Sequence, residues 1–107
     1  MLPKKKRVTK NLFLSIMKDK EIIHGSFFVF YYKKQTDPQY AFVAPKNVAR
    51  KATDRNKLRR KGYNAIRLLN VPSGAGLFFY KKSGVNATSQ DIKTDISFLL
   101  KKANFIK

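Results

Sequence analysis

The sequence lacks several of the residues on which protein chemistry most often depends. It has no cysteine, no tryptophan and one histidine, His24, and only 6 of its 107 residues are acidic. The missing cysteines exclude disulfides, thiolate catalysis and cysteine-based zinc sites. The acids are too scattered to form a recognisable metal-ligand cluster; they are Asp19, Glu21, Asp37, Asp54, Asp91 and Asp95. We therefore expect no catalytic residue and no metal site on this chain. We interpret His24, just before Gly25, as a turn residue, and a lone general base is the weaker alternative.

Long apolar runs are also absent from the sequence. Neither a membrane-spanning helix nor the apolar core of a signal peptide is predicted. Apolar residues still make up 43% of the chain, with nine Phe and five Tyr, which is enough to build a buried core. The length is typical of one small domain, so we predict a single domain over residues 1–107.

Basic residues are the one class in large excess. The chain has 24 Lys and Arg against 6 acids, which gives a formal net charge of +18. A compact chain with this excess repels itself, and the excess points to an anionic partner. Nucleic acid fits best, because each neutralised phosphate releases condensed counterions. An anionic membrane surface is the weaker alternative.

The first ten residues form a basic arm that contains no acid. A short basic run of this kind also resembles a nuclear import signal. We favour a solvated arm that contacts RNA, and we predict such contacts from Lys4, Lys5, Lys6 and Arg7.

The first part of the chain predicts one helix and two strands. Asn11 is placed to cap a helix over 12–18. Aromatic and β-branched residues dominate 26–33, which predicts a strand. A turn containing Asp37-Pro38 separates it from a second strand over 40–44. We predict that these two strands pair with each other as a hairpin.

From Val48 onward the apolar residues recur with a helical period. One helix face collects Leu58, Gly62, Ala65, Ile66 and Leu69. In a helix interior Gly62 costs about 1 kcal/mol relative to alanine. Its place on the apolar face predicts close packing against the sheet, and a kink is the alternative.

The last part of the chain predicts a loop, a strand and a helix. The Pro, Ser and Gly residues of 72–76 indicate a loop, and 77–80 a short buried strand. Thr88 or Ser89 can cap a final helix that has Asp91 in its first turn. Its apolar stripe is Ile92, Ile96, Leu99, Leu100 and Ala103, and Lys101-Lys102 suit its last turn. This order predicts an α+β fold in which one sheet packs against helices.

The densest positive charge lies between positions 46 and 67. Only Asp54 opposes nine basic residues there: Lys46, Arg50, Lys51, Arg55, Lys57, Arg59, Arg60, Lys61 and Arg67. On a helix, a broad side beside the apolar stripe collects Arg55, Asn56, Arg59, Arg60 and Arg67. Arginine binds phosphate with a bidentate fork, and asparagine can read a base edge or a 2′-hydroxyl.

A solvated helix surface is the alternative for this basic segment. Solvated charge runs usually alternate in sign, and oppositely charged pairs four residues apart then stabilise the helix. Here Arg55 and Arg59 are like charges at that spacing, and so are Lys57 and Lys61. The pattern therefore favours a binding surface for a polyanion.

The run from Val48 to Arg60 resembles the signature of the bacterial ribonuclease P protein family. In that family a Ser-Lys-Lys stretch ends a strand and leads into an Arg-Asn-Arg helix. Here Pro45-Lys46-Asn47 precedes Arg55-Asn56-Lys57, so Lys57 keeps the charge of the last arginine without its fork. Phe13 with Met17, Phe28-Val29-Phe30-Tyr31 and Phe78-Phe79-Tyr80-Lys81-Lys82 resemble further family segments, so the resemblance covers nearly the whole chain.

The resemblance implies an α+β fold with a sheet of about four strands, antiparallel or mixed. It also implies a left-handed crossover through the basic helix. The implied role is the protein subunit of ribonuclease P, in the cytoplasm, with ribonuclease P RNA and precursor tRNA as partners. The RNA would remove the 5′ leader with Mg²⁺ that RNA mainly holds. The protein itself would bind no cofactor, no membrane and no small-molecule substrate, and would not be catalytic.

The resemblance also assigns residues to two surfaces. Contacts to the RNA subunit are expected from Lys46, Arg50, Lys51, Arg55, Asn56, Lys57, Arg59, Arg60 and Arg67. The leader is expected in a cleft between the first helix and the sheet, on Phe13, Met17 and Tyr31, because single strands bind aromatic platforms flanked by positive charge. Phe13 and Met17 can instead be core residues, whereas the hydroxyl of Tyr31 suits a cleft rim. Lys81 and Lys82 are expected to contribute further RNA contacts.

Two other classes of protein fit the charge and the size. A structural ribosomal protein is the main alternative, but it has no need of a leader-binding cleft. A DNA-binding protein would need a recognition helix with a partner helix in a turn arrangement. The sequence predicts a strand before Val48 instead.

Overall fold

The computed structural model describes residues 7–19 and 21–106. Along the chain lie helix α1 (Lys10–Asp19), strands β1 (Glu21–His24), β2 (Phe28–Lys33) and β3 (Pro38–Val43), helix α2 (Ala52–Leu68), strand β4 (Gly74–Tyr80), a 3-10 turn η2 (Lys82–Gly84) and helix α3 (Ser89–Lys102). The strands form one sheet in the order β1-β2-β4-β3. Strand β2 is antiparallel to both of its neighbours, β1 and β4, and β3 runs parallel to β4. This mixed sheet with packed helices confirms the predicted α+β class.

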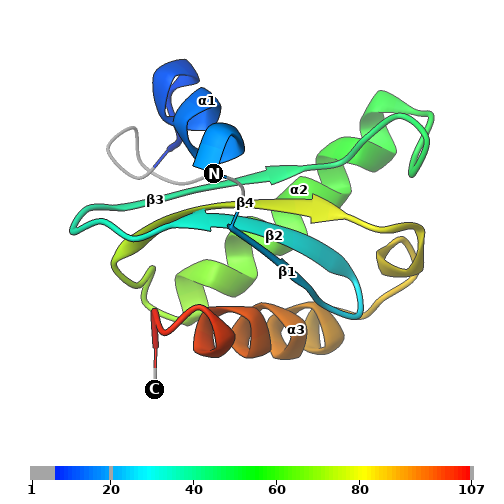
Figure 1. Ribbon diagram of the computed structural model, residues 1–107. Coiled ribbons are helices and arrows are strands. Elements are labelled where there is room, and N and C mark those ends of the chain that lie inside the picture. The colour runs from blue at the N-terminus through cyan, green and yellow to red at the C-terminus, as the bar shows by residue number, and fades with distance from the viewer. Residues whose placement is uncertain (1–6, 20, 107) are drawn as a thin grey trace.

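Helices cover both faces of the sheet (Figure 1). Helix α1 packs on one face against β2 and β4, whereas α3 packs on the other face and contacts α2. Strands β3 and β4 both run from left to right in Figure 1, and α2, which connects them along the chain, passes behind the sheet. With β4 below β3 in that view, the β3–α2–β4 crossover is left-handed, the rare hand for such a unit. None of the helices in the described ranges is long and apolar enough to cross a bilayer.

The main core lies between the sheet and the pair α2 and α3. Aromatic rings fill its centre: Phe42 and Phe30 each stack on Phe78, with ring centroids 4.7 Å and 4.3 Å away. The buried hydroxyl of Tyr40 donates to the carbonyl of Pro72 at 2.7 Å, and that of Tyr80 donates to the carbonyl of Leu58. Burial raises the pKa of both phenols, so both stay neutral and keep these hydrogen bonds.

Helix α3 begins and packs as predicted. The Thr88 hydroxyl accepts from the backbone N–H of Asp91 at 3.1 Å, and the Asp91 carboxylate accepts from the N–H of Thr88 at 3.2 Å. The predicted stripe, Ile92, Ile96, Leu99, Leu100 and Ala103, is buried. One buried acid, Asp95, accepts from the backbone N–H groups of Ser26 and Phe27, each at 2.9 Å. This carboxylate ties α3 to the turn between β1 and β2.

The predicted hairpin between the strands now defined as β2 and β3 is wrong. Strand β4 lies between them, antiparallel to β2 and parallel to β3. All of β4 except Phe79 is buried, and an apolar strand gains most from the central place, where both of its faces are covered. Periodicity within a strand carries no information about its partner.

Several element boundaries also differ from the sequence prediction, and one strand was missed. Strand β2 begins at Phe28 and not at 26, and β3 covers Pro38–Val43 and not 40–44. The first helix begins at Lys10, and Thr9 rather than Asn11 accepts its capping hydrogen bond, from the N–H of Leu12 at 3.2 Å. Strand β1 was missed because it has four residues, two of them Glu21 and His24, at a sheet edge. The basic helix begins at Ala52, not Val48, since the N–H groups of Val48 and Ala49 both bond to the carbonyl of Pro45 in a turn.

Two glycines that pack against aromatic rings explain why the start of β4 was wrongly predicted and why the packing of α2 was correctly predicted. The segment 72–76 was predicted as a loop, but Gly74, Ala75 and Gly76 belong to β4. A Cβ on Gly76 would lie 2.2 Å from the ring of Phe30, so this glycine provides space and does not mark a turn. Gly62 packs directly on Phe42 within a continuous α2, which confirms close packing and not a kink.

Candidate nucleic-acid interface

The outer side of α2 and the turn before it present a dense array of cations. Seven of the nine residues predicted to contact RNA there are exposed: Lys46, Arg50, Lys51, Asn56, Lys57, Arg60 and Arg67. Arg55 and Arg59 are half-buried. Within residues 7–19 and 21–106, no ion pair involves a basic residue of α2. The side chains are therefore not neutralised within that part of the chain, and they repel one another until an anion binds.

Arg55 has a structural contact that the sequence did not reveal. Its guanidinium donates to the carbonyls of Ala49 and Arg50, at 3.1 Å and 2.6 Å. The N-cap residue Lys51 makes no side-chain capping hydrogen bond, so Arg55 is what ties the preceding turn to the helix. This geometry orients Arg50 and Lys51 beside the helix and leaves Arg55 fewer free N–H groups than Arg60.

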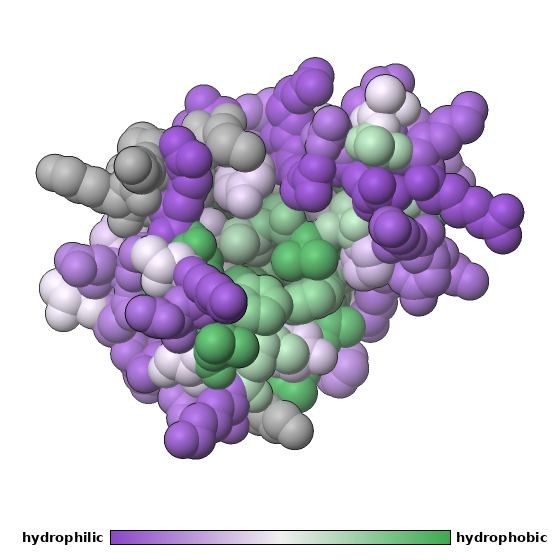
Figure 2. Space-filling view, turned by 90° about the horizontal axis from the view of Figure 1, so that it is seen from above, coloured by the Kyte–Doolittle hydropathy of each residue, from purple (hydrophilic) through white to green (hydrophobic). Residues whose placement is uncertain are grey.

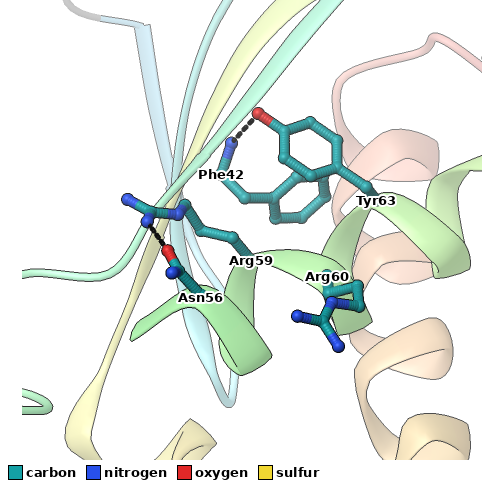
Figure 3. Close-up of a pocket in the computed structure, with 5 residues that line it drawn as sticks. All are labelled: Phe42, Asn56, Arg59, Arg60 and Tyr63. Atoms are coloured by element: carbon teal, nitrogen blue, oxygen red, sulfur yellow. Dashed lines mark hydrogen bonds between the residues drawn. The ribbon is translucent and has the colours of Figure 1, made fainter. Parts of the chain in front are cut away.

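A pocket opens between α2 and the edge strand β3 (Figure 3). Its volume is about 660 Å³, and it is lined by Phe42, Asn56, Arg59, Arg60 and Tyr63. The guanidinium of Arg59 donates to the side-chain oxygen of Asn56, as Figure 3 shows. Tyr63 was not singled out from the sequence. Its signal is its position seven residues after Asn56, which puts it on the same helix side.

The three residues predicted to bind the leader lie together on the opposite face of the sheet. Phe13 and Met17 from α1 and Tyr31 from β2 are half-buried around the buried residues Ile16, Ala75 and Leu77. Phe79 joins them, with its ring centroid 5.2 Å from that of Tyr31. The sequence prediction missed Phe79, and it missed the two residues beside it in register, Val29 and Val43.

Figure 2 looks onto this face, which has an apolar floor with hydrophilic side chains on both sides. Lys33 lies near the floor, with its ammonium 2.8 Å from the hydroxyl of Ser15 and 3.7 Å from Asp19. We name this surface the aromatic cleft and define it by Phe13, Met17, Tyr31 and Phe79. A partly exposed aromatic floor with cations at its margin is the arrangement that holds unstacked bases.

The remaining predicted contacts lie apart from these two surfaces or outside the described residues. Lys81 donates to the carbonyl of Gly25 at 2.7 Å and so helps to hold the β1–β2 turn, whereas Lys82 is exposed. Arg7 pairs with Tyr40 at the edge of β3, and its carbonyl accepts from Gln39 at 3.2 Å. The predictions for Lys4, Lys5 and Lys6 fall outside the described residues.

No three His, Asp or Glu side chains of the described residues converge on a point where they could hold a metal ion. His24 is exposed and ends β1, directly before the turn at Gly25. The chemistry that these surfaces support is binding, by charge and by stacking.

Comparisons with known proteins agree on one family. The model of the family described as Ribonuclease P matches residues 2–104. Among solved structures, the ribonuclease P protein of Staphylococcus aureus has a TM-score of 0.82 at 19% identity, with 97% of this chain and 100% of that chain covered. The ribonuclease P protein of Thermotoga maritima has a TM-score of 0.75 at 23% identity, with 84% and 89% covered. No curated protein sequence is similar enough to count as a match.

Proposed function

Because the chain belongs to the ribonuclease P protein family, we propose how its two surfaces share the work of the holoenzyme. The chain is the protein subunit of ribonuclease P, and the RNA of that enzyme is its partner. The outer side of α2 binds the RNA subunit, and the aromatic cleft binds the 5′ leader of precursor tRNA. The observation that carries this division is that the sheet lies between the two surfaces, with α1 on one face and α2 on the other.

The α2 side suits folded RNA because its charge is dense and not neutralised within the described chain. Lys57 and Arg60 are exposed and make no hydrogen bond to another side chain in the described ranges. Each phosphate that they bind would release condensed counterions. The half-buried Arg59 and its partner Asn56 add donors for base edges or 2′-hydroxyls.

The aromatic cleft suits single-stranded RNA because it offers ring faces and few fixed charges. Each base that stacks on Tyr31 or Phe79 would contribute roughly 1–3 kcal/mol with little preference for sequence. An enzyme that accepts many different leaders needs that tolerance. The precursor would gain these contacts and the mature tRNA would not, so the protein would favour substrate over product.

The catalyst in this proposal is the RNA, with Mg²⁺ held mainly by RNA phosphates. The described residues offer no converging ligand set for that ion, so no step passes through a metal held by the protein. The protein instead screens the repulsion between two polyanions. Its effect should therefore be largest at low Mg²⁺ and low salt, where the RNAs have fewest counterions of their own.

Reconstitution tests the proposal. The protein is mixed with the ribonuclease P RNA of the same organism and a precursor tRNA at low Mg²⁺, and mature 5′ ends are measured. We expect clear stimulation over the RNA alone. A lack of stimulation would contradict the assigned role and revive the structural alternative of a small basic ribosomal protein.

The division of labour has its own test. Tyr31→Ala should weaken the preference of the holoenzyme for precursor over mature tRNA by roughly tenfold, which is the value of one stacked base, while affinity for the RNA subunit stays the same. Tyr31→Phe keeps the ring and serves as the matched control. Arg60→Ala should lower affinity for the RNA subunit and leave the preference for precursor over mature tRNA unchanged. Two variants that lose the same property would show that the surfaces are not separate.

A further inference from the structure

We propose that the pocket between α2 and β3 binds one unstacked nucleotide of the RNA subunit, with its base on the ring of Tyr63. The inference rests on the proposed function and deepens it. A surface that holds only phosphates would recognise charge and shape. A pocket that takes one base selects the place in the RNA where a nucleotide is free to leave the stack.

The first support is the pattern along α2. Asn56, Arg59, Arg60 and Tyr63 are at i, i+3, i+4 and i+7, so they form one stripe on the helix. Arg67 continues this stripe by another turn. Tyr63 is half-buried and packs against the core on one side. Its other side lines the pocket beside Asn56, Arg59 and Arg60, where a ring adds no charge but can stack a base.

The second support is that the Tyr63 ring is held in position and still accessible. Its centroid lies 5.0 Å from that of Phe42 at an interplanar angle of 75°. Its hydroxyl accepts from the backbone N–H of Phe42 at 3.4 Å, as Figure 3 shows. Phe42 is only 2% exposed, so an incoming base meets Tyr63 and not Phe42. A ring fixed in this way loses little freedom when a base stacks on it.

The third support is the set of polar groups around the ring. The side-chain oxygen of Asn56 already accepts from Arg59, which leaves the Asn56 amide N–H groups to donate to a base edge or a 2′-hydroxyl. Arg59 keeps further N–H groups, and Arg60 is exposed for a phosphate. No acidic residue lines the pocket. A planar, anionic ligand that is rich in acceptors, such as a nucleotide, matches this set of groups.

The size of the pocket agrees with one nucleotide. Its volume of about 660 Å³ lies within the range of roughly 300–1,000 Å³ that small-ligand pockets have. A nucleotide within an RNA strand also gains from Lys57 and Arg67 on the same helix, because its neighbours bring further phosphates. A free mononucleotide has no such neighbours, so the pocket favours the strand.

The test compares three variants of the full chain in binding to the ribonuclease P RNA. Tyr63→Leu removes the ring, and we expect the affinity to fall roughly 5- to 100-fold, with an unchanged slope of affinity against salt since no phosphate contact is lost. Tyr63→Phe keeps the ring and should bind like the wild type. Phe98→Leu is the matched control, because Phe98 is exposed on α3 and is absent from the pocket; it should bind like the wild type.

Chemical probing of the RNA bases supplies a second readout that a change in stability would not mimic. The wild-type protein should protect one unpaired base that Tyr63→Leu leaves reactive at saturating protein. Equal affinity and an equal protection pattern for Tyr63→Leu would overturn the inference, even where the wild type stimulates cleavage. A wild type without any stimulation would instead contradict the proposed function. Tight binding of adenosine or guanosine monophosphate without RNA would show that the pocket serves a free nucleotide, which also overturns it.

Discussion

Replacing Gly62 with alanine sets two physical effects against each other. Alanine is the better helix former, and in an open helix it would stabilise the protein by about 1 kcal/mol. Gly62 is not in an open position. A Cβ there would lie 2.3 Å from Cδ2 and 2.6 Å from Cε2 of Phe42. The first distance is short of ordinary van der Waals contact, roughly 3.5–4.0 Å between carbons, by more than about 1 Å.

The packing effect should prevail because the ring of Phe42 cannot move away. It stacks on Phe78 at 4.7 Å and meets Tyr63 at 5.0 Å. Helix α2 must therefore move outward, which loosens the contacts of Leu58 and Ile66 with the sheet. Overpacking of this kind costs about 3 kcal/mol at the upper end of its range. After the gain in helix propensity, we expect a net destabilisation of about 2 kcal/mol, or a fall in melting temperature of about 8 °C.

Urea unfolding and thermal melting of Gly62→Ala measure this change directly. The double variant Gly62→Ala with Phe42→Leu provides the control, because the smaller side chain makes room for the new methyl group. The two changes should be less than additive, with at least 1 kcal/mol of coupling. A Gly62→Ala protein as stable as the wild type, or more stable, would refute the reasoning and show that α2 is not pressed against β3.

Three further predictions concern single side chains. Arg60→Ala should leave unfolding by urea unchanged and reduce the slope of log affinity against log salt by about 0.7–0.9, the value of one phosphate contact. Arg55→Ala should lower the free energy of unfolding by about 1–2 kcal/mol, because it removes the hydrogen bonds that hold the turn before α2; unchanged stability would return Arg55 to the phosphate-binding set. Asp95→Ala leaves the N–H groups of Ser26 and Phe27 without acceptors and should cost about 2–4 kcal/mol, whereas Asp91→Ala, which removes only half of an exposed cap, should cost about 1 kcal/mol in the same melting experiment.

The aromatic cleft shows how far the sequence could lead towards a site. The family resemblance assigned Phe13, Met17 and Tyr31 to one surface, and in the structure all three pack around the cluster of Ile16, Ala75 and Leu77. Phe79 was read only as part of a buried strand. Its exposure depends on α1 covering Ala75 and Leu77 while leaving the next row of the sheet open, and no local pattern records which row a distant helix will cover.

The sequence by itself determined most of the local elements and the kind of partner. A 3.6-residue period placed the buried stripe of α2, the Thr88–Asp91 pair marked the start of α3, and the excess of like charges around Arg60 indicated a polyanion. These features depend on neighbours within a few residues, so the chain encodes them locally. The tertiary structure alone decided the order of the strands, the contact of Arg55 with the preceding turn, and the pocket at Tyr63. Each of these brings together groups whose positions depend on how whole elements pack, and that packing is set by burial over the entire fold and not by any one segment.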